Sequence, residues 1–593
     1  MKQSWRGILK DIYLTTFLSA IVLLFSKVPS HAVTKSGFLL AQNTPGDTPA
    51  DPDIPPFRPV EPTPPSPQLD TLPPLEDLLE EPPPPLPNEQ PQELIGTFRV
   101  ERFEVEGSTV FSDEEIEAVL QDYIERPITF TELLQVETVL TKLYTDNGYI
   151  NSGAVIPLQT IQDGVVKVNI IEGSLDDIEV TVNGRLNEDY VRSRLEKATG
   201  TPFNIEKLQQ ALQLLQLDPL IENLTAELAV GASRDRWMLD IEVNQANAFN
   251  PVIFANNSRT PSVGSFQRGV ELNHDNLLGF GDRFSTIYKN TDGSNDIETS
   301  YTFPFNASNG TVGFRYRYVD SDIVEEPFDD IDIESETDQY QFSLRQPILL
   351  TANDRSTQEV ALGLEFSRQS NRITIGDEPS NFSAGADANG ETRISVLRFF
   401  QDWTKRTREN VLAARSQFSV GVDLFDATIN EDAPDSSFFA WRGQFQWLQR
   451  LDSESDINLL LRSDIQLTSS ELVPLEQFSI GGISSVRGYR QDVLLGDEGV
   501  FASAEVRIPL YRWSNNQNSF SLIPFVDFGT VWGDFERLQD EDTLVSVGAG
   551  IQLALSDRLR ARLDYGIPII EVDSTERTAQ ENGIYFSIEY FPF

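Results

Sequence analysis

The stretch Ser484–Arg490 (SSVRGYR) lies between two strand-like segments near the start of the last fifth of the chain. Gly481-Gly482 precede it, and Gly496 and Gly499 follow it. Glycine gives such a segment the backbone freedom to fold back on itself. Arg487 stands beside a glycine and an aromatic residue in a region that is otherwise rich in acids. The pattern therefore predicts a long, folded-back loop with an isolated arginine.

A candidate partner for Arg487 lies about forty residues further on, in Phe525–Gly529 (FVDFG). Strand alternation places Asp527 on the same face as Phe525 and Gly529, and the residues between them give the other face an apolar character. An acid on the inner face of such a strand needs a cation, and Arg487 is the predicted one. The alternative is a solvated Arg487 and an Asp527 that lines a wet lumen. These residues alone leave both interpretations open.

The composition of the chain excludes several classes of function. Its 593 residues exceed a single ordinary core, so several domains or one large barrel are expected. The 46 basic and 92 acidic residues give 46 − 92 = −46, which argues against a nucleic-acid partner.

Catalysis and metal binding also have little support in the residue types. The chain has no cysteine, and its two histidines, His31 and His274, rule out histidine triads and histidine clusters. No pair among the many acids stands out as catalytic. We therefore predict that the protein is not an enzyme and has no catalytic residues, no metal site and no cofactor.

Residues 1–32 are typical of a secretory signal peptide. Three basic residues precede an apolar run at 14–25, and small residues follow up to Ala32. The run is too short for a spanning helix, which needs about 20 residues. We expect cleavage after Ala32, with Ala41 as the alternative position.

Residues 33–96 are predicted to form a disordered, Pro-rich linker. Of the 35 prolines in the chain, 18 fall between residues 43 and 91. Proline fixes φ and removes a hydrogen-bond donor, and the segment has few large apolar residues with which to build a core. A semi-rigid tether is the expected result. The alternative is a Pro-rich ligand for another protein.

Two similar α+β modules are predicted at 97–173 and 174–246. In each, one strand is followed by two capped helices and then by two strands, and this repeat defines the architecture. The first comprises a strand at 98–105, helices that begin with capping boxes at Ser112 and Thr129, a helix stop at Asn147-Gly148, and strands at 154–161 and 165–171 joined by the Asp163-Gly164 turn. The second comprises a strand at 178–182, helices capped by Asn187 and Asn204, and strands at 224–230 and 238–243.

The edge of such a small sheet can accept an extended strand from a partner protein. The alternative is that both modules are only spacers.

Residues 247–593 are predicted to form an antiparallel β-barrel of about 16 strands in an outer membrane. Helical periodicity ends there, and about sixteen alternating runs of roughly ten residues follow. In the clearest run, 310–319, Phe314 and Tyr316 share one face while Arg315 and Arg317 share the other. A soluble sandwich would also alternate, but sixteen strands would need two sandwiches and a boundary that the sequence does not contain.

The lengths of the connections alternate as well. Short turns such as 278–281 alternate with long acidic connections such as 320–338, as in barrels with short periplasmic turns and long external loops. The Arg487 segment falls between the eleventh and twelfth runs, on the external side. Because it is more apolar and Gly-rich than its neighbours, we expect the loop 469–499 to fold into the lumen.

Several motifs resemble those of two-partner secretion translocators of the haemolysin secretion/activation type. Residues 98–174 are similar to the first POTRA domain of this family, 175–246 look like the second, and the remainder resembles the sixteen-stranded barrel. The resemblance in the first domain is carried by 105–111 (VEGSTVF), 148–154 (GYINSGA) with Gly148 and Tyr149, 163–166 (DGVV) with Asp163 and Gly164, and 172–173 (EG).

The lumen loop and its wall also have counterparts in the wider POTRA–barrel superfamily. The residues Val486, Arg487, Gly488 and Tyr489 resemble the hallmark of the loop that enters the barrel. The residues Phe525, Asp527 and Gly529 are similar to the inner-wall motif with which that arginine pairs. The resemblance implies an Arg487–Asp527 pair inside the lumen.

The same resemblance implies the function. One large β-helical exoprotein would be caught unfolded by the POTRA domains in the periplasm, passed through the barrel in the outer membrane, and folded outside. An assembly factor for other barrels is the first alternative, and a passive porin the second. The sequence predicts neither the identity of the partner nor an oligomeric state.

Overall fold

The computed structural model describes residues 97–592, except 234, 354, 377, 382, 432–433, 453–454, 515–516, 534–541 and 573–577. The predicted signal peptide and linker lie outside the described residues. Among the residues that are described, no helix is long and apolar enough to cross a membrane.

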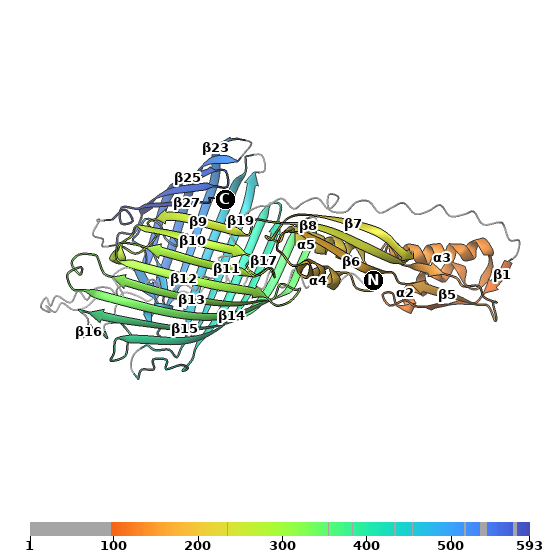
Figure 1. The fold of residues 1–593 in the computed structure, drawn as a ribbon, viewed down its shortest axis with the longest axis horizontal. Coiled ribbons are helices and arrows are strands. Elements are labelled where there is room, and N and C mark those ends of the chain that lie inside the picture. The colour runs from red at the N-terminus through yellow and green to blue at the C-terminus, as the bar shows by residue number, and fades with distance from the viewer. Residues whose placement is uncertain are drawn as a thin grey trace, which may run out of the picture. The chain divides into compact units, whose positions relative to one another are not determined.

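The first module is a three-stranded sheet covered by two helices (Figure 1). Both predicted capping boxes form, at Ser112 with Glu115 and at Thr129 with Glu132. Its elements are β1 (Thr97–Val100), β2 (Arg102–Glu106), α2 (Asp113–Leu120), η2 (Gln121–Tyr123), β3 (Arg126–Thr129), α3 (Phe130–Thr145), β4 (Gly153–Val155) and β5 (Val165–Ile171). The sheet order is β2-β5-β4, with β2 parallel to β5. One face of α3 is buried through Val136, Leu140 and Tyr144.

Two predicted strands of this module are wrong in extent. The strand expected at 98–105 divides at Glu101, because β1 pairs with β3 whereas β2 pairs with β5. At the division, the Glu101 amide donates to the Gly164 carbonyl at 2.8 Å. The strand expected at 154–161 stops at Val155, because the next amide donates to the Glu137 carboxylate and Pro157 has no N–H to give.

The second module repeats this topology. Its elements are β6 (Ser174–Asn183), α4 (Glu188–Ala198), α5 (Ile205–Gln216), β7 (Ile221–Ser233) and β8 (Arg236–Gln245). The sheet order is β6-β8-β7, and β6 runs parallel to β8. The side chains of Asn187 and Asn204 accept the first amides of α4 and α5, as predicted. A core of its own, centred on Leu195, Leu208 and Leu212, makes the module a separate packing unit.

The remaining strands close into an antiparallel barrel (Figure 1). Sixteen strands span it within the described residues: β9 (Phe249–Asn256), β10 (Gln267–Asp275), β11 (Arg283–Asn290), β12 (Ser294–Pro304), β13 (Thr311–Asp322), β14 (Ile333–Asn353), β15 (Ser356–Ile375), β17 (Glu391–Thr407), β18 (Asn410–Gly421), β19 (Phe439–Asp452), β20 (Ile457–Thr468), β23 (Glu498–Trp513), β24 (Asn518–Trp532), β25 (Thr543–Leu555), β26 (Leu559–Pro568) and β27 (Ile584–Tyr590). The short β16 (Glu378–Pro379) extends one external connection, and β27 pairs with β9 to complete the ring. The fold class predicted from the sequence is confirmed.

Several strands are much longer than the ten residues expected. β14 has 21 residues and β15 has 20, and they pair along nearly their whole length. The acidic segment 320–338 was expected to be a loop, but only 323–332 connects the strands. The acidic residues on either side of 323–332 belong to the ends of β13 and β14, because the pairing of these strands continues to Asp322 and Glu334.

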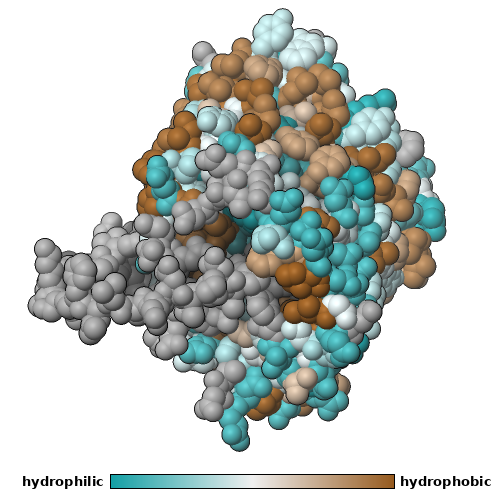
Figure 2. Space-filling view, turned by 90° about the vertical axis from the view of Figure 1, so that its left-hand side faces the viewer, coloured by the Kyte–Doolittle hydropathy of each residue, from teal (hydrophilic) through white to brown (hydrophobic). Residues whose placement is uncertain are grey.

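The two faces of the barrel wall differ in character. On β24, Val526 and Phe528 are 51% and 39% exposed, whereas Phe525 and Asp527 on the other face are 3% and 0% exposed. Figure 2 shows brown, apolar residues at several places along the flanks of the molecule, beside teal, hydrophilic ones. The outward face is therefore apolar and the inward face is polar, as predicted from the alternation.

Gly164→Ala is expected to destabilise the first module. Gly164 has a φ of +71°, and an added Cβ would lie 2.6 Å from the Glu101 Cγ and 3.1 Å from its backbone nitrogen. The left-handed conformation alone costs a non-glycine residue about 1–2 kcal/mol. Limited proteolysis of the purified full-length protein should show faster cleavage within 97–173. Gly200→Ala is the control, because nothing lies within 4 Å of its added Cβ; equal cleavage of the two variants would contradict the expectation.

Candidate functional site

The loop between β20 and β23 is packed against the inner wall of the barrel. It contains η4 (Pro474–Glu476) and a small hairpin of β21 (Phe478–Ile480) and β22 (Leu494–Gly496). Loop side chains including Ile480, Val486 and Tyr489 form one buried cluster with Phe501, Val531 and Leu544 of the wall strands. The loop thus covers part of the inner faces of β23, β24 and β25. Its apolar residues account for this position, because packing removes them from water.

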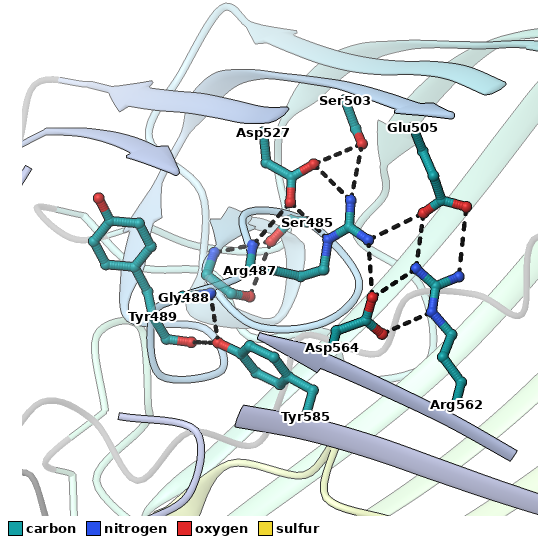
Figure 3. A network of polar contacts seen from close by, with 11 residues as sticks. Ser485, Arg487, Gly488, Tyr489, Ser503, Glu505, Asp527, Arg562, Asp564 and Tyr585 are labelled. Carbon is teal, nitrogen blue, oxygen red and sulfur yellow. Dashed lines mark hydrogen bonds and ion pairs between the residues drawn. The ribbon is translucent and has the colours of Figure 1, made fainter. Parts of the chain in front are cut away.

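Arg487 at the tip of the loop is only 1% exposed and binds Asp527 through two parallel hydrogen bonds (Figure 3). Its Nε lies 2.7 Å from Oδ2, and its Nη2 lies 2.9 Å from Oδ1. The backbone amide of Arg487 also donates to Asp527, at 3.2 Å. This bidentate geometry is the strong form of an arginine–carboxylate contact. The alternative of a solvated Arg487 is wrong.

Phe525 completes the enclosure of the arginine. The guanidinium carbon of Arg487 lies 3.4 Å from the centre of the Phe525 ring. A cation over an aromatic face is attracted by the ring quadrupole. Because Phe525 and Asp527 are two apart on β24, both point inward to the same guanidinium.

Two further carboxylates meet Arg487 inside the wall. Its Nη1 lies 3.0 Å from Glu505 of β23 and 3.5 Å from Asp564 of β26. Arg562 joins these two acids, at 2.8 Å from Glu505 and 2.7 Å from Asp564 (Figure 3). Arg507 contacts Glu505 at 2.8 Å.

The cluster around Arg487 contains ions of both signs. The guanidinium groups of Arg487, Arg507 and Arg562 face the three carboxylates of Glu505, Asp527 and Asp564. Buried ions are tolerated only when they are paired and hydrogen-bonded, so each member depends on the others. The reasoning from sequence missed Glu505 and Asp564. Strand alternation places both on the inner face, but it does not say which acids on separate strands meet.

The other residues of the loop motif fix the backbone around Arg487. Gly488 has a φ of +102°, and an added Cβ would come within 3.2 Å of the Gly566 backbone, so only glycine fits. Its amide donates to the Tyr585 hydroxyl at 3.0 Å. The Tyr489 hydroxyl donates to the backbone carbonyl of Val545 at 2.7 Å.

Gly529 of the wall motif makes room for the loop. A Cβ at this position would lie 2.9 Å from the Val486 side chain and 3.1 Å from the Ile480 side chain. The motif residues of loop and wall thus form one contact surface.

The four predicted residues of the first module lie in two separate places. Gly148, with a φ of +84°, ends α3, and the Tyr149 ring packs edge-on against Phe111. Asp163 and Gly164 form the turn before β5, with φ values of 51° and 71°. All four shape the module, and none lies in the lumen cluster.

A polar network that the sequence reasoning missed lies beside Tyr149. The Tyr144 hydroxyl donates to the Ser108 hydroxyl at 2.8 Å, and Glu172 accepts from the Thr109 amide at 2.7 Å. Burial raises the pKa of Tyr144 to about 12, so the phenol stays protonated and donates at any physiological pH. These contacts join α3 to the turn after β2.

Comparisons with known proteins show the family of this chain. The sequence profile of the haemolysin secretion/activation protein family ShlB/FhaC/HecB matches residues 238–553, more than half of the chain. The profile of the ShlB-type POTRA domain matches residues 98–173. The chain belongs to the haemolysin secretion/activation family.

Individual relatives are similar in sequence, and a solved structure shares the fold. The chain is 21% identical over 461 residues to the heme/hemopexin transporter protein HuxB of Haemophilus influenzae strain 86-028NP, covering 74% of this chain and 78% of HuxB. It is 22% identical over 500 residues to the outer membrane transporter CdiB of Escherichia coli O6:K15:H31, covering 82% of each. The fold matches that of CdiB from Escherichia coli with a TM-score of 0.65 at 18% identity, covering 88% of this chain and 94% of the other.

The family assignment gives the class of function and the location. This member of the haemolysin secretion/activation family is an outer-membrane transporter that exports an exoprotein, with its POTRA domain in the periplasm. The family and the relatives are transporters. In the part of the chain that the structure describes, no group of three or more His, Asp or Glu residues is placed to hold a metal ion.

Asp527→Asn is expected to loosen the lumen loop. Removing one partner of a buried ion pair costs up to about 3–5 kcal/mol, and Arg487 would lose its bidentate partner while it keeps the contacts to Glu505 and Asp564. The purified protein in planar lipid bilayers should then spend more time in high-conductance states. Asp557→Asn, at an exposed turn position, is the matched control. Identical conductance records for the two variants would contradict the structural role of the pair.

Proposed function

We propose that this transporter exports one large β-helical partner protein by two-partner secretion. The observation that carries the proposal is a closed barrel whose lumen holds a loop through a cluster of buried ion pairs, in a chain of the secretion/activation family. A loop held by ion pairs closes the passage at rest and can move without breaking the barrel wall. Export of the chain is transport, and the proposal contains no catalytic step.

The POTRA modules are proposed to capture the partner in an extended state. Each module has a three-stranded sheet with a strand at its edge, β4 in the first and the 13-residue β7 in the second. An added strand gains main-chain hydrogen bonds along such an edge, and side-chain pockets give specificity. Apolar side chains are exposed close to both edges, including Val155 at 45% and Val230 at 49%.

The energy for export is proposed to come from folding of the partner outside the cell. The sequence contains no nucleotide-binding motif, and the periplasm supplies no nucleotide. A β-helix that forms on the far side removes the extended chain from the lumen and prevents its return. The outward apolar side chains of the barrel, such as Val526 and Phe528, are proposed to contact outer-membrane lipid.

The direct test compares the surface proteome and secretome of intact cells with and without this gene. Loss of one large exoprotein, with other outer-membrane barrels unchanged, is the expected result. A fall in many barrels would contradict export and indicate an assembly factor, and no change in either would indicate a pore for small solutes.

Complementation then tests the role of Arg487 in export. Wild type and Arg408→Ala, which changes an exposed residue of a turn, are expected to restore the exoprotein. Arg487→Ala is expected to restore much less at equal abundance in the membrane, because three buried carboxylates lose a partner. Full restoration by Arg487→Ala would show that export does not need the ion cluster.

A further inference from the structure

We propose that Glu476 is a second positioning residue of the lumen loop and that, with Arg398, it fixes the base of the loop to a different sector of the wall. The Arg487 cluster holds the tip to β23, β24 and β26. Glu476 holds the base to β17, supported by β15. This inference concerns closure of the lumen and does not depend on which partner is exported.

The contact between Glu476 and Arg398 is short and shielded from water. Arg398 Nη2 donates to Glu476 Oε1 at 2.6 Å, and the side chains are 4% and 13% exposed. The guanidinium is oriented from the wall side, because its Nη1 donates to the Ser367 hydroxyl and lies 3.5 Å from Glu365. Both supporting residues are on β15, next to β17 in the barrel. The wall therefore presents a cation that is already aimed when the loop carboxylate reaches it.

The base of the loop also has its own apolar contacts with this sector. Leu472, Val473 and Leu475 are 0%, 0% and 7% exposed. They pack in one cluster with Ile394 and Val396 of β17 and with wall residues at and before the start of β19. This cluster shares no residue with the cluster around Val486 and Tyr489. The tip and the base of the loop thus each have an ion pair and a separate apolar contact.

Hydrogen bonds make the base a rigid unit. Asp497, at the end of the loop, accepts from the Leu472 amide at 2.9 Å and from the Gln477 side chain at 3.2 Å. The Gln466 side chain on β20 donates to the backbone carbonyls of Glu476, at 2.8 Å, and of Asp497, at 3.1 Å. The backbone of Glu476 is therefore held at a defined position, and the ion pair does not have to order a free chain.

The two anchors have opposite polarity. At the tip, a loop cation meets wall anions, and at the base, a loop anion meets a wall cation. They lie on separate strands and share no partner, so their energetic effects should add. Loss of either anchor is therefore expected to shift the loop toward its released state.

The test is single-channel recording of the purified full-length protein in planar lipid bilayers. Glu476→Gln keeps the size of the side chain and removes its charge, and it should raise the ratio of open to closed time about tenfold through loss of a charge-assisted bond. Glu471→Gln makes the same change at an exposed position of the same loop and should leave the ratio unchanged. Glu476→Asp keeps the charge on a shorter side chain and should give an intermediate value.

The double variant Glu476→Gln/Asp527→Asn tests whether the loop has two independent anchors or only one. If both anchors hold the loop, the logarithms of the two single effects add. A heat-modifiable shift on electrophoresis identifies folded barrels, and only folded protein is recorded. A folded Glu476→Gln that behaves like Glu471→Gln would overturn the proposal, as would a double variant that equals Asp527→Asn alone. Neither result would bear on export, which the surface proteome tests separately.

Discussion

An arginine enclosed in a barrel wall has to be matched by carboxylates, and this requirement organises the lumen of the transporter. Arg487 enters on a loop, and its carboxylate partners come from three different strands of the wall. Asp527 supplies a bidentate contact. Glu505 and Asp564 contact the same guanidinium, and Arg562 pairs with both of these acids. Removal of any one ion would take a partner from another in a site with little water. These contacts hold the loop at one position, although its backbone joins the barrel strands only at its two ends.

The same constraint explains the glycines and aromatic residues around the cluster. Gly488 and Gly529 are small because the loop backbone and the Val486 side chain lie against the wall. Phe525 covers the face of the guanidinium, which removes the remaining contact with solvent. A transporter needs a lumen that stays closed without a partner and opens without unfolding of the wall. In the proposed function, discrete polar contacts on a separate loop meet both needs, because they can exchange while the strand ladder stays intact.

The sequence predicted the fold class. The residues alone left the pairing of Arg487 with Asp527 open, and the family resemblance implied it. The sequence did not predict Glu505 and Asp564, because their meeting depends on how β23 and β26 are placed in the closed barrel. The sequence also underestimated the strand lengths. In the later part of β15 the outward positions include Arg368 and Arg372, so the hydrophobic alternation ends before the strand does. In the first module, competing hydrogen bonds at Glu101 and Glu137 shortened two predicted strands.

The most direct test of the central claim is whether the loop lies inside the lumen in living cells. The chain has no cysteine, so a single Ser485→Cys reports on a loop position that is only 2% exposed. A membrane-impermeant maleimide should label Asp330→Cys in an exposed external connection, leave Ser485→Cys unlabelled, and label Ser485→Cys once Arg487→Ala is added. Labelling of Ser485→Cys at the rate of Asp330→Cys, with Arg487 intact, would contradict a loop held in the barrel.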